Sequence, residues 1–215
     1  IPDTELALVI ASCGTAGGIT RARNAGISEK DIVVIDPKRF PKKDPLAPSV
    51  FGEAILKELK VRGITVAMQN GWLPLTPTNV IEHLPKAFFN QHPGSPEFGG
   101  KGMHGIRVHA AVRHFADHVH RVMTHTHVIA QYVDPEFDKG AVVRYEQVRI
   151  YPYDTPEDIQ ARALPKEHRN SINLLQDVAK GRVQEVTNRI PIVLPGEEAL
   201  LKDAIAHGIR AYANN

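Results

Sequence analysis

The chain has 215 residues, of which 42% are hydrophobic and 23% charged. This composition is that of a globular protein and excludes collagen-like, coiled-coil and disordered chains. Twenty-six basic and 24 acidic residues give a formal net charge of +2, too small to indicate a nucleic acid or an anionic membrane as partner. No apolar run approaches the roughly 18 residues that cross a bilayer. The single cysteine, Cys13, excludes an intramolecular disulfide and fits a cytoplasmic protein.

The first half of the chain alternates short apolar runs with helical spacing. In chain order, the pattern predicts a strand at 6–11, a helix at 19–25, a strand at 31–35, a Lys- and Pro-rich loop at 38–48, a helix at 50–61, a strand at 64–68, a helix at 78–84 and a buried strand at 87–89. The chain begins with Ile rather than Met and shows no signal-peptide pattern, so we expect that Ile1 is not the biological start.

The second half begins with a loop at 91–102 that is rich in glycine and proline. Thr155 followed by Pro156 is a strong helix start, and Asp158 stands where a capping box needs its acid. The remaining elements are predicted as a helix at 104–121, strands at 128–133 and 141–150, a helix at 155–180, a strand at 190–193 and a helix at 197–212.

Strand–helix units of this length predict one α/β domain over residues 1–215, with a mostly parallel sheet and helices on both of its faces. Ligands of such folds bind beyond the carboxyl ends of the strands. The loops after the strands at 87–89 and 128–133 are therefore the places where we expect a site.

Asn90-Gln91-His92-Pro93 stands at the first of these strand ends. Asn90 and His92 are two residues apart and so point to the same side of a strand. An amide can donate a hydrogen bond to a carbonyl oxygen, and an imidazole can transfer a proton or stabilise charge near neutral pH. The pattern is short, and a turn asparagine beside a solvated histidine is the alternative.

Asp138 lies in Glu136-Phe137-Asp138-Lys139-Gly140, between the predicted strands at 128–133 and 141–150. A carboxylate beside His92 would orient the imidazole and favour its charged form. The alternative is an ordinary aspartate of a hairpin turn.

Taken in order, Asn90 to Pro93, the segment from Gly99 to Gly105, the stretch around Asp138 and the helix from Thr155 to His168 resemble the folate-dependent formyltransferases, most closely the phosphoribosylglycinamide formyltransferases of purine synthesis. The resemblance implies a Rossmann-like formyltransferase fold and transfer of a formyl group from 10-formyltetrahydrofolate to an amine, without a metal. It also implies that Asn90, His92 and Asp138 are the catalytic residues, with protonated His92 and Asn90 stabilising an oxyanion.

The resemblance further implies two binding regions. Folate would lie in an apolar cleft formed by Trp72, Leu73, Leu75, Val80, Val133 and Asp134. The amine substrate would contact Pro93, Gly94 and Glu167. The alternatives are that Trp72 and Leu73 are core residues and that Glu167 is an exposed helix residue.

Some features depart from the family pattern. The strand at 6–11 matches the family's second strand, so we expect the first strand and the phosphate loop upstream of residue 1; Gly14 to Gly18 is the alternative phosphate loop. A sugar-nucleotide formyltransferase, a formyltetrahydrofolate hydrolase and a non-catalytic folate-binding relative stay open, as does a homodimer. The histidine group with His114 and His118 four residues apart could suggest a metal, but a polar helix face is the preferred interpretation.

Overall fold

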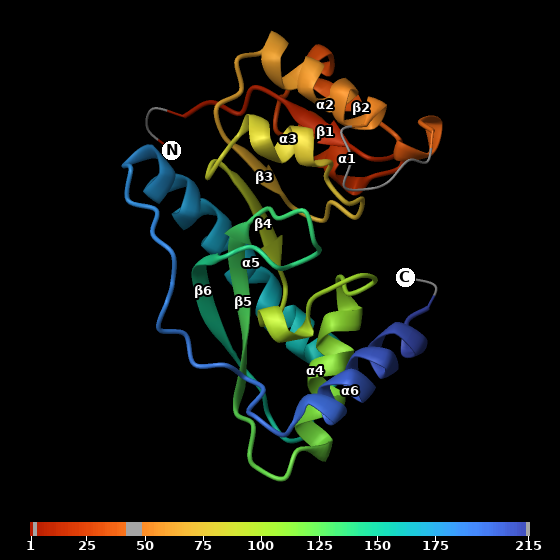
Figure 1. Ribbon diagram of the computed structural model, residues 1–215, viewed down its shortest axis with the longest axis vertical. Helices are drawn as coiled ribbons and strands as arrows, with labels where there is room; N and C mark the ends of the chain where they lie inside the picture. The colour runs from red at the N-terminus through yellow and green to blue at the C-terminus, as the bar shows by residue number, and fades with distance from the viewer. Residues whose placement is uncertain (2–3, 42–48, 214–215) are drawn as a thin grey trace. The chain divides into compact units, whose positions relative to one another are not determined.

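The computed structural model describes residues 1, 4–41 and 49–213, which form two compact units (Figure 1). Of the described residues, the smaller unit contains 4–41, 49–89 and 133–135, and the larger contains residue 1, 90–132 and 136–213. The single catalytic domain expected from the sequence stays a prediction, and residues 42–48 of the predicted loop lie outside the described residues.

The smaller unit carries short strands and three α-helices. Strands β1 and β2 pair in parallel, with Val9 opposite Ile32. The elements are β1 (Val9–Ala11), α1 (Gly17–Asn24), β2 (Ile32–Val34), α2 (Val50–Val61), β3 (Ala67–Gln69) and α3 (Thr78–His83), with 3-10 turns η1 (Glu29–Asp31) and η2 (Pro37–Arg39).

Helix α2 shows why the sequence folds as it does in this unit. Ser49 caps it, because its hydroxyl oxygen accepts a hydrogen bond from the Gly52 N–H at 3.0 Å. Phe51, Ile55 and Leu59 recur at helical spacing, and all three are buried in the core of the unit. The ring of Phe51 also stacks on that of Trp72, with centroids 6.2 Å apart.

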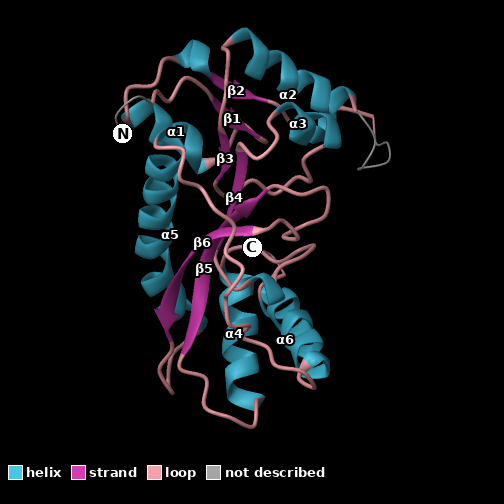
Figure 2. Cartoon of the chain, turned by 60° about the vertical axis from the view of Figure 1, so that its left-hand side comes forward, coloured by secondary structure: helices cyan, strands magenta, loops and turns pink. Residues whose placement is uncertain are grey.

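The larger unit is built around an antiparallel strand pair and three long helices (Figure 2). Helix α5 packs against β5 and β6, and α6 packs against α4. Residues 90–92 of strand β4 belong to this unit, where the strand order is β4-β5-β6. The elements are β4 (Phe88–His92), η3 (Pro96–Phe98), α4 (Ile106–His118), β5 (His125–Tyr132), β6 (Val142–Arg149), α5 (Pro156–Ala179) and α6 (Glu198–Ala211).

The pairing of β5 with β6 is interrupted near one end. His125 stands opposite Arg149, and the register shifts between Ala130 and Gln131. Such a bulge turns the following side chain away from the regular alternation of the strand. It therefore re-aims Gln131, whose role is described below.

Helix α5 starts as the sequence predicts. The Thr155 hydroxyl accepts from the Asp158 N–H at 3.2 Å, and the Asp158 carboxylate accepts from the Thr155 N–H at 2.9 Å. This reciprocal capping box satisfies two backbone donors that have no partner within the helix. Ile159, Ala163 and Leu174 are completely buried, so this face of the helix is fixed on the core.

The mixed α/β class with a parallel strand pair is confirmed, but two sequence predictions need correction. No strand forms at 190–193, because Pro191 lacks the N–H that a sheet ladder needs. Asn90 and His92 lie within β4 rather than after it, since the strand extends to His92. None of the described helices is long and apolar enough to cross a membrane.

Candidate active site

The structure brings Asn90, His92 and Asp138 together in the larger unit. The Asn90 Nδ2 donates to Asp138 Oδ1 at 3.2 Å, and His92 Nδ1 lies 3.5 Å from the same oxygen. Asn90 and His92 come from the end of β4, whereas Asp138 comes from the turn between β5 and β6. His92 is 2% exposed, so this imidazole is shielded from solvent.

Two further donors fix the Asp138 carboxylate. Gln131 Nε2 donates to Oδ1 at 3.0 Å, and the Gly100 N–H donates to Oδ2 at 2.9 Å. Four nitrogen atoms of separate residues therefore surround one carboxylate. Such a set of charge-assisted hydrogen bonds orients the carboxylate before any ligand arrives.

The backbone around Asp138 explains the Asp-x-Gly sequence at this turn. Asp138 has a φ of +57°, a left-handed conformation that aspartate tolerates better than most residues. A Cβ atom at Gly140 would lie 1.8 Å from the carbonyl oxygen of Tyr132, so only glycine fits there. The position of the Asp138 carboxylate therefore depends on a left-handed backbone at Asp138 and on a glycine at position 140.

Two glycines of the loop after β4 pack directly on the site. A Cβ at Gly99 would lie 2.5 Å from the Cβ of Asp138. A Cβ at Gly94 would lie 2.4 Å from Val108 Cγ1 and 3.6 Å from His92 Nε2. A side chain at Gly99 would therefore displace Asp138, and one at Gly94 would displace Val108, which lies beside the ring of His92.

Burial controls the charge of the histidines at the site. Burial lowers the pKa of His92, and the neighbouring Asp138 only partly opposes this effect. Burial and the nearby His92 lower the pKa of His109 to about 4. Burial of His92 therefore favours the neutral form of its imidazole, while Asp138 favours the charged form, and the protonated imidazole expected from the sequence stays a prediction.

The free nitrogen of His92 is the atom that the site leaves for chemistry. Its Nε2 is buried and has no hydrogen-bond partner among the described residues. Because Nδ1 faces Asp138, the neutral imidazole places its proton on Nδ1 and leaves Nε2 as an acceptor. Asn90 uses one amide hydrogen toward Asp138, which leaves its second for another acceptor.

Glu167 is not the exposed helix residue that the alternative interpretation expected. It is half-buried on α5, and this burial raises the pKa of its carboxyl to about 7. No described residue donates a hydrogen bond or pairs with it. Pro93 lies next to His92, and Gly94 lies against its ring, so two of the three predicted amine contacts lie beside the catalytic candidates.

The six predicted folate residues all lie in the smaller unit. Val80 is completely buried, and Trp72 and Val133 pack on the same core cluster, so these three side chains also stabilise the unit. Leu73 is 54% exposed, whereas Leu75 and Asp134 are half-buried. The buried Trp72 Nε1 has no acceptor among the described residues, which fits a heteroaromatic ligand with a hydrogen-bond acceptor.

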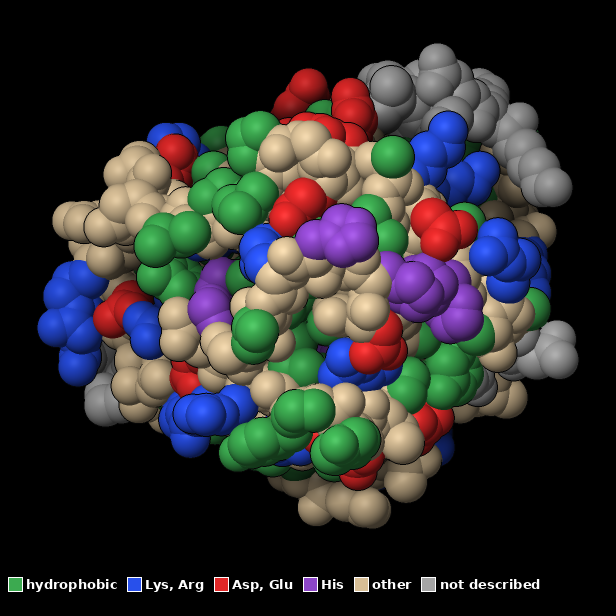
Figure 3. All heavy atoms as spheres, turned by 90° about the horizontal axis from the view of Figure 1, so that it is seen from below, with side chains coloured by type: hydrophobic (Ala, Val, Ile, Leu, Met, Phe, Trp, Pro, Cys, Tyr) green, Lys and Arg blue, Asp and Glu red, His purple; other side chains and the backbone are tan. Residues whose placement is uncertain are grey.

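A separate group of histidines lies on α4 and α6, where His118 is exposed and His114 and His207 are half-buried. His114 stacks on His118 and on His207, with ring centroids 4.2 and 4.3 Å apart, and its Nε2 lies 2.7 Å from Asp203 Oδ2. Figure 3 shows histidine side chains gathered on one face among acidic and basic groups. Within the described ranges, no three or more His, Cys, Asp or Glu side chains could hold a metal ion. The absence of a metal from the reaction stays a prediction.

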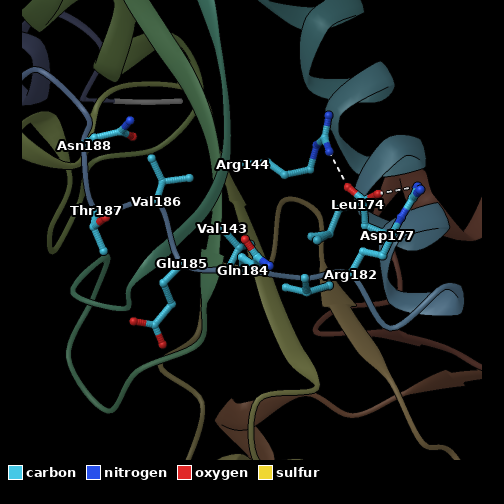
Figure 4. A pocket seen from close by; sticks show the side chains of 11 residues that line it. Val143, Arg144, Leu174, Asp177, Arg182, Gln184, Glu185, Val186, Thr187 and Asn188 are labelled. Carbon is cyan, nitrogen blue, oxygen red and sulfur yellow. Dashed lines mark hydrogen bonds and ion pairs between the residues drawn. The ribbon is translucent and has the colours of Figure 1, made fainter.

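A cavity of about 400 Å³ lies elsewhere in the larger unit, beside the segment that follows α5. Arg144 and Arg182 converge on Asp177 at its wall (Figure 4). None of the predicted site residues lines this cavity. Its lining segment continues directly to Arg189, which contacts the loop after β4.

Sequence reasoning missed two residues that shape the site, Gln131 and His109. Gln131 is 1% exposed in a strand whose neighbours Val128 to Ala130 are apolar, and His109 is completely buried in an apolar stretch of α4. A lone polar residue in an apolar run is the signal that could have found both, since a buried polar group needs a partner or a function. Gly99 and Gly100 belong to a segment that carries the family resemblance, but the sequence does not show that they contact Asp138.

Comparison with known proteins gives a family match over most of the chain. The model of the family described as "Formyl transferase" matches residues 2–175. The chloroplastic phosphoribosylglycinamide formyltransferase of Arabidopsis thaliana is 27% identical over 190 residues, which cover 88% of this chain and 61% of that protein. A phosphoribosylglycinamide formyltransferase of Dictyostelium discoideum is 25% identical, over 79% of this chain and 82% of that protein.

Solved structures show the same fold. Glycinamide ribonucleotide transformylase 1 from Symbiobacterium toebii superposes with a TM-score of 0.69 at 25% identity, covering 85% of this chain and 78% of that one. Phosphoribosylglycinamide formyltransferase from Brucella melitensis gives 0.65 at 26% identity, with 83% of each chain covered. The chain spans 61% and 56% of the length of two plant relatives that it matches.

Proposed function

Because the chain belongs to the formyl transferase family, we propose that it transfers a formyl group from 10-formyltetrahydrofolate to the amine of phosphoribosylglycinamide. The observation that carries this proposal is the approach of Asn90, His92 and Asp138 to one another from distant parts of the chain. Their amide, imidazole and carboxylate are the groups that an acyl transfer to an amine requires. The names of the relatives in the comparisons support the choice of amine.

The folate co-substrate would supply an activated formyl carbon, and the residues of the chain would handle the charge and the proton. Asn90 Nδ2 donates its free hydrogen to the formyl oxygen as negative charge develops there. A donor placed in this way contributes about 3–4 kcal/mol to lowering the barrier. Neutral His92 accepts at Nε2 the proton that the attacking amine releases.

Asp138 stabilises the charge that His92 then carries. The imidazolium Nδ1–H faces the carboxylate, and the Nε2–H donates a hydrogen bond to the oxyanion. As the carbonyl re-forms and the bond between the formyl carbon and N10 of the folate breaks, the Nε2 proton passes to N10. The hydrogen bonds from Gln131 and Gly100 keep the Asp138 carboxylate in place while this charge moves. The role of Asp138 is thus to stabilise the imidazolium, and the carboxylate stays ionised throughout.

The binding residues belong to the same proposal. Trp72, Leu73, Leu75, Val80, Val133 and Asp134 would contact the folate, and Pro93, Gly94 and Glu167 the amine substrate. The buried Trp72 Nε1 and the exposed Leu73 support the first set. The half-buried Glu167, which no described residue pairs, supports the second. Action in the cytoplasm, small molecules as partners and use of no metal are also part of the proposal.

The test is an assay of the purified chain with 10-formyltetrahydrofolate and three acceptors, namely phosphoribosylglycinamide, an amino sugar nucleotide and water. Mass spectrometry of the products identifies where the formyl group goes. The proposal expects a formylated glycinamide as the main product. Formation of formate alone would indicate a hydrolase, a formylated sugar would indicate the other transferase, and no consumption of the folate would indicate a binding protein; each result contradicts the proposal.

A further inference from the structure

The segment that follows α5 reaches back to the loop after β4 through one arginine. Arg189 Nη2 donates to Glu97 Oε1 at 2.6 Å, and its Nη1 donates to the Ser95 hydroxyl at 2.9 Å. The side chains of Arg189 and Glu97 are only 15% and 17% exposed. A planar guanidinium that bonds two residues at once restricts both their distance and their orientation.

The ion pair is intact at neutral pH. Burial alone would raise the pKa of Glu97, but hydrogen bonds from Arg189 and Ser95 hold it below its usual value. Loss of the arginine would leave a half-buried carboxylate without its cation. Removing one partner of a buried ion pair destabilises a fold more than replacing both partners by apolar residues does.

This anchored loop is attached to the candidate active site at both ends. At its start, Gly94 lies against the ring of His92. At its end, Gly99 packs on Asp138 and the Gly100 N–H donates to the carboxylate at 2.9 Å. Ser95 and Glu97, the two residues that Arg189 holds, stand between these contacts.

We propose that Arg189 is a positioning residue for the formyl transfer, acting through Ser95 and Glu97 on the loop that fixes His92 and Asp138. This inference rests on the proposed function. It goes beyond the family match, which ends at residue 175, before Arg189. Arg189 itself contacts none of the three catalytic candidates in the described hydrogen bonds, so its effect passes through the loop.

The kinetic test compares Arg189→Gln, Glu97→Gln and the double variant with Arg182→Gln as matched control. Arg182 stands in the same segment and is 60% exposed. In Arg189→Gln, kcat falls by about 10- to 100-fold while KM for the folate changes little, because small misplacements of catalytic groups are costly. The double variant loses no more than Arg189→Gln alone, because the single variant has already broken the anchor that the two residues share. Arg182→Gln stays within about twofold of the unmodified chain.

A second readout does not depend on activity. NMR-detected hydrogen exchange of the Gly100 amide reports directly on its bond to Asp138. In Arg189→Gln this amide exchanges at least about tenfold faster, whereas the Ile129 amide in β5 does not. If the unmodified chain has no transferase activity, the proposed function is wrong. The ratio of the exchange rates of the Gly100 amide in the variant and in the original then still shows whether Arg189 positions the loop.

Three results would overturn the inference. They are a kcat of Arg189→Gln within twofold of the original, losses in the two single variants that simply multiply in the double variant, and equal changes of exchange at Gly100 and Ile129. Any one of them would mean that the ion pair stabilises the unit without positioning the site.

Discussion

Two carboxyl groups of the larger unit, Asp138 and Glu167, have opposite environments. Hydrogen bonds from Asn90, Gln131 and the Gly100 N–H converge on Asp138, and His92 lies 3.5 Å away. Glu167 is half-buried without a described partner, and its pKa is raised to about 7. Asp138 is thus held by donors of the protein itself, whereas no described residue fixes the carboxyl group of Glu167.

The difference indicates how the two groups contribute to function. A carboxylate held by fixed donors costs no reorganisation when charge develops next to it. A buried carboxyl group without a partner instead destabilises the folded chain, and a ligand that donates a hydrogen bond to it would remove this destabilisation. Under the proposed function, catalysis would depend on the rigidity of Asp138, and substrate recognition on the lack of a protein partner for Glu167.

The largest effect is expected for Asp138→Asn. Asparagine keeps the left-handed backbone at this position but removes the negative charge that stabilises the His92 imidazolium. We expect kcat to fall by about 10³- to 10⁴-fold, as for other carboxylates that orient a catalytic histidine. Steady-state kinetics measures the loss, and Asp203→Asn at the histidine stack is the control. Activity within tenfold of the original would reject the role.

Next is Gly99→Ala, which tests how closely the loop defines the position of Asp138. The new methyl group would lie 2.5 Å from the Asp138 Cβ, so one of the two must move. We expect a loss of about 10² in kcat. Gly181→Ala is the control for kcat, since nothing lies within 4 Å of its Cβ position. Equal kinetics of the two variants would contradict the tight packing of the site.

Glu167→Gln tests the other side of the comparison through stability. The folded-state pKa of about 7 lies above the unfolded value, so the favourable contribution of Glu167 is complete below about pH 4.5 and is lost as pH rises through 7. The free energy of unfolding of the variant should therefore be roughly 2 kcal/mol higher than that of the original chain at pH 8, and the same at pH 4.

Urea unfolding at both pH values measures this change, with the exposed Glu82→Gln as control. That control should stay within about 0.5 kcal/mol of the original at either pH. A Glu167→Gln variant that is less stable than the original at pH 8 would show that Glu167 has a partner after all.

The smallest effect is expected for Gln131→Met. Methionine fills a similar volume but removes the donor to Asp138 Oδ1, while Asn90 and Gly100 still hold the carboxylate. We expect kcat to fall by about tenfold, the value of one hydrogen bond to a charged group. Gln147→Met, exposed on β6, serves as control and should be neutral.

The sequence predicted the elements well where local signals are strong. The capping residues Thr155 and Asp158 and the apolar spacing of Phe51, Ile55 and Leu59 are local features, and α5 and α2 form where they indicate. The strand predicted at 190–193 does not form. Its apolar residues fit a buried strand, but Pro191 has no N–H for a hydrogen bond to a neighbouring strand.

The site could be predicted only in part. Asn90, His92 and Asp138 came from the motif order, and the structure brings them together. The charge state of His92 could not be predicted, because its pKa depends on burial by elements far apart in the chain. The same holds for Arg189, whose partners Ser95 and Glu97 lie more than 90 residues earlier in the sequence.

The most direct test of the central claim is a crystal structure of the chain with an analogue that joins the folate and amine substrates through the formyl carbon. We predict that the formyl oxygen lies about 3 Å from both Asn90 Nδ2 and His92 Nε2, with Asp138 still facing His92 Nδ1. An analogue bound with its formyl group away from Asn90 and His92 would contradict the account.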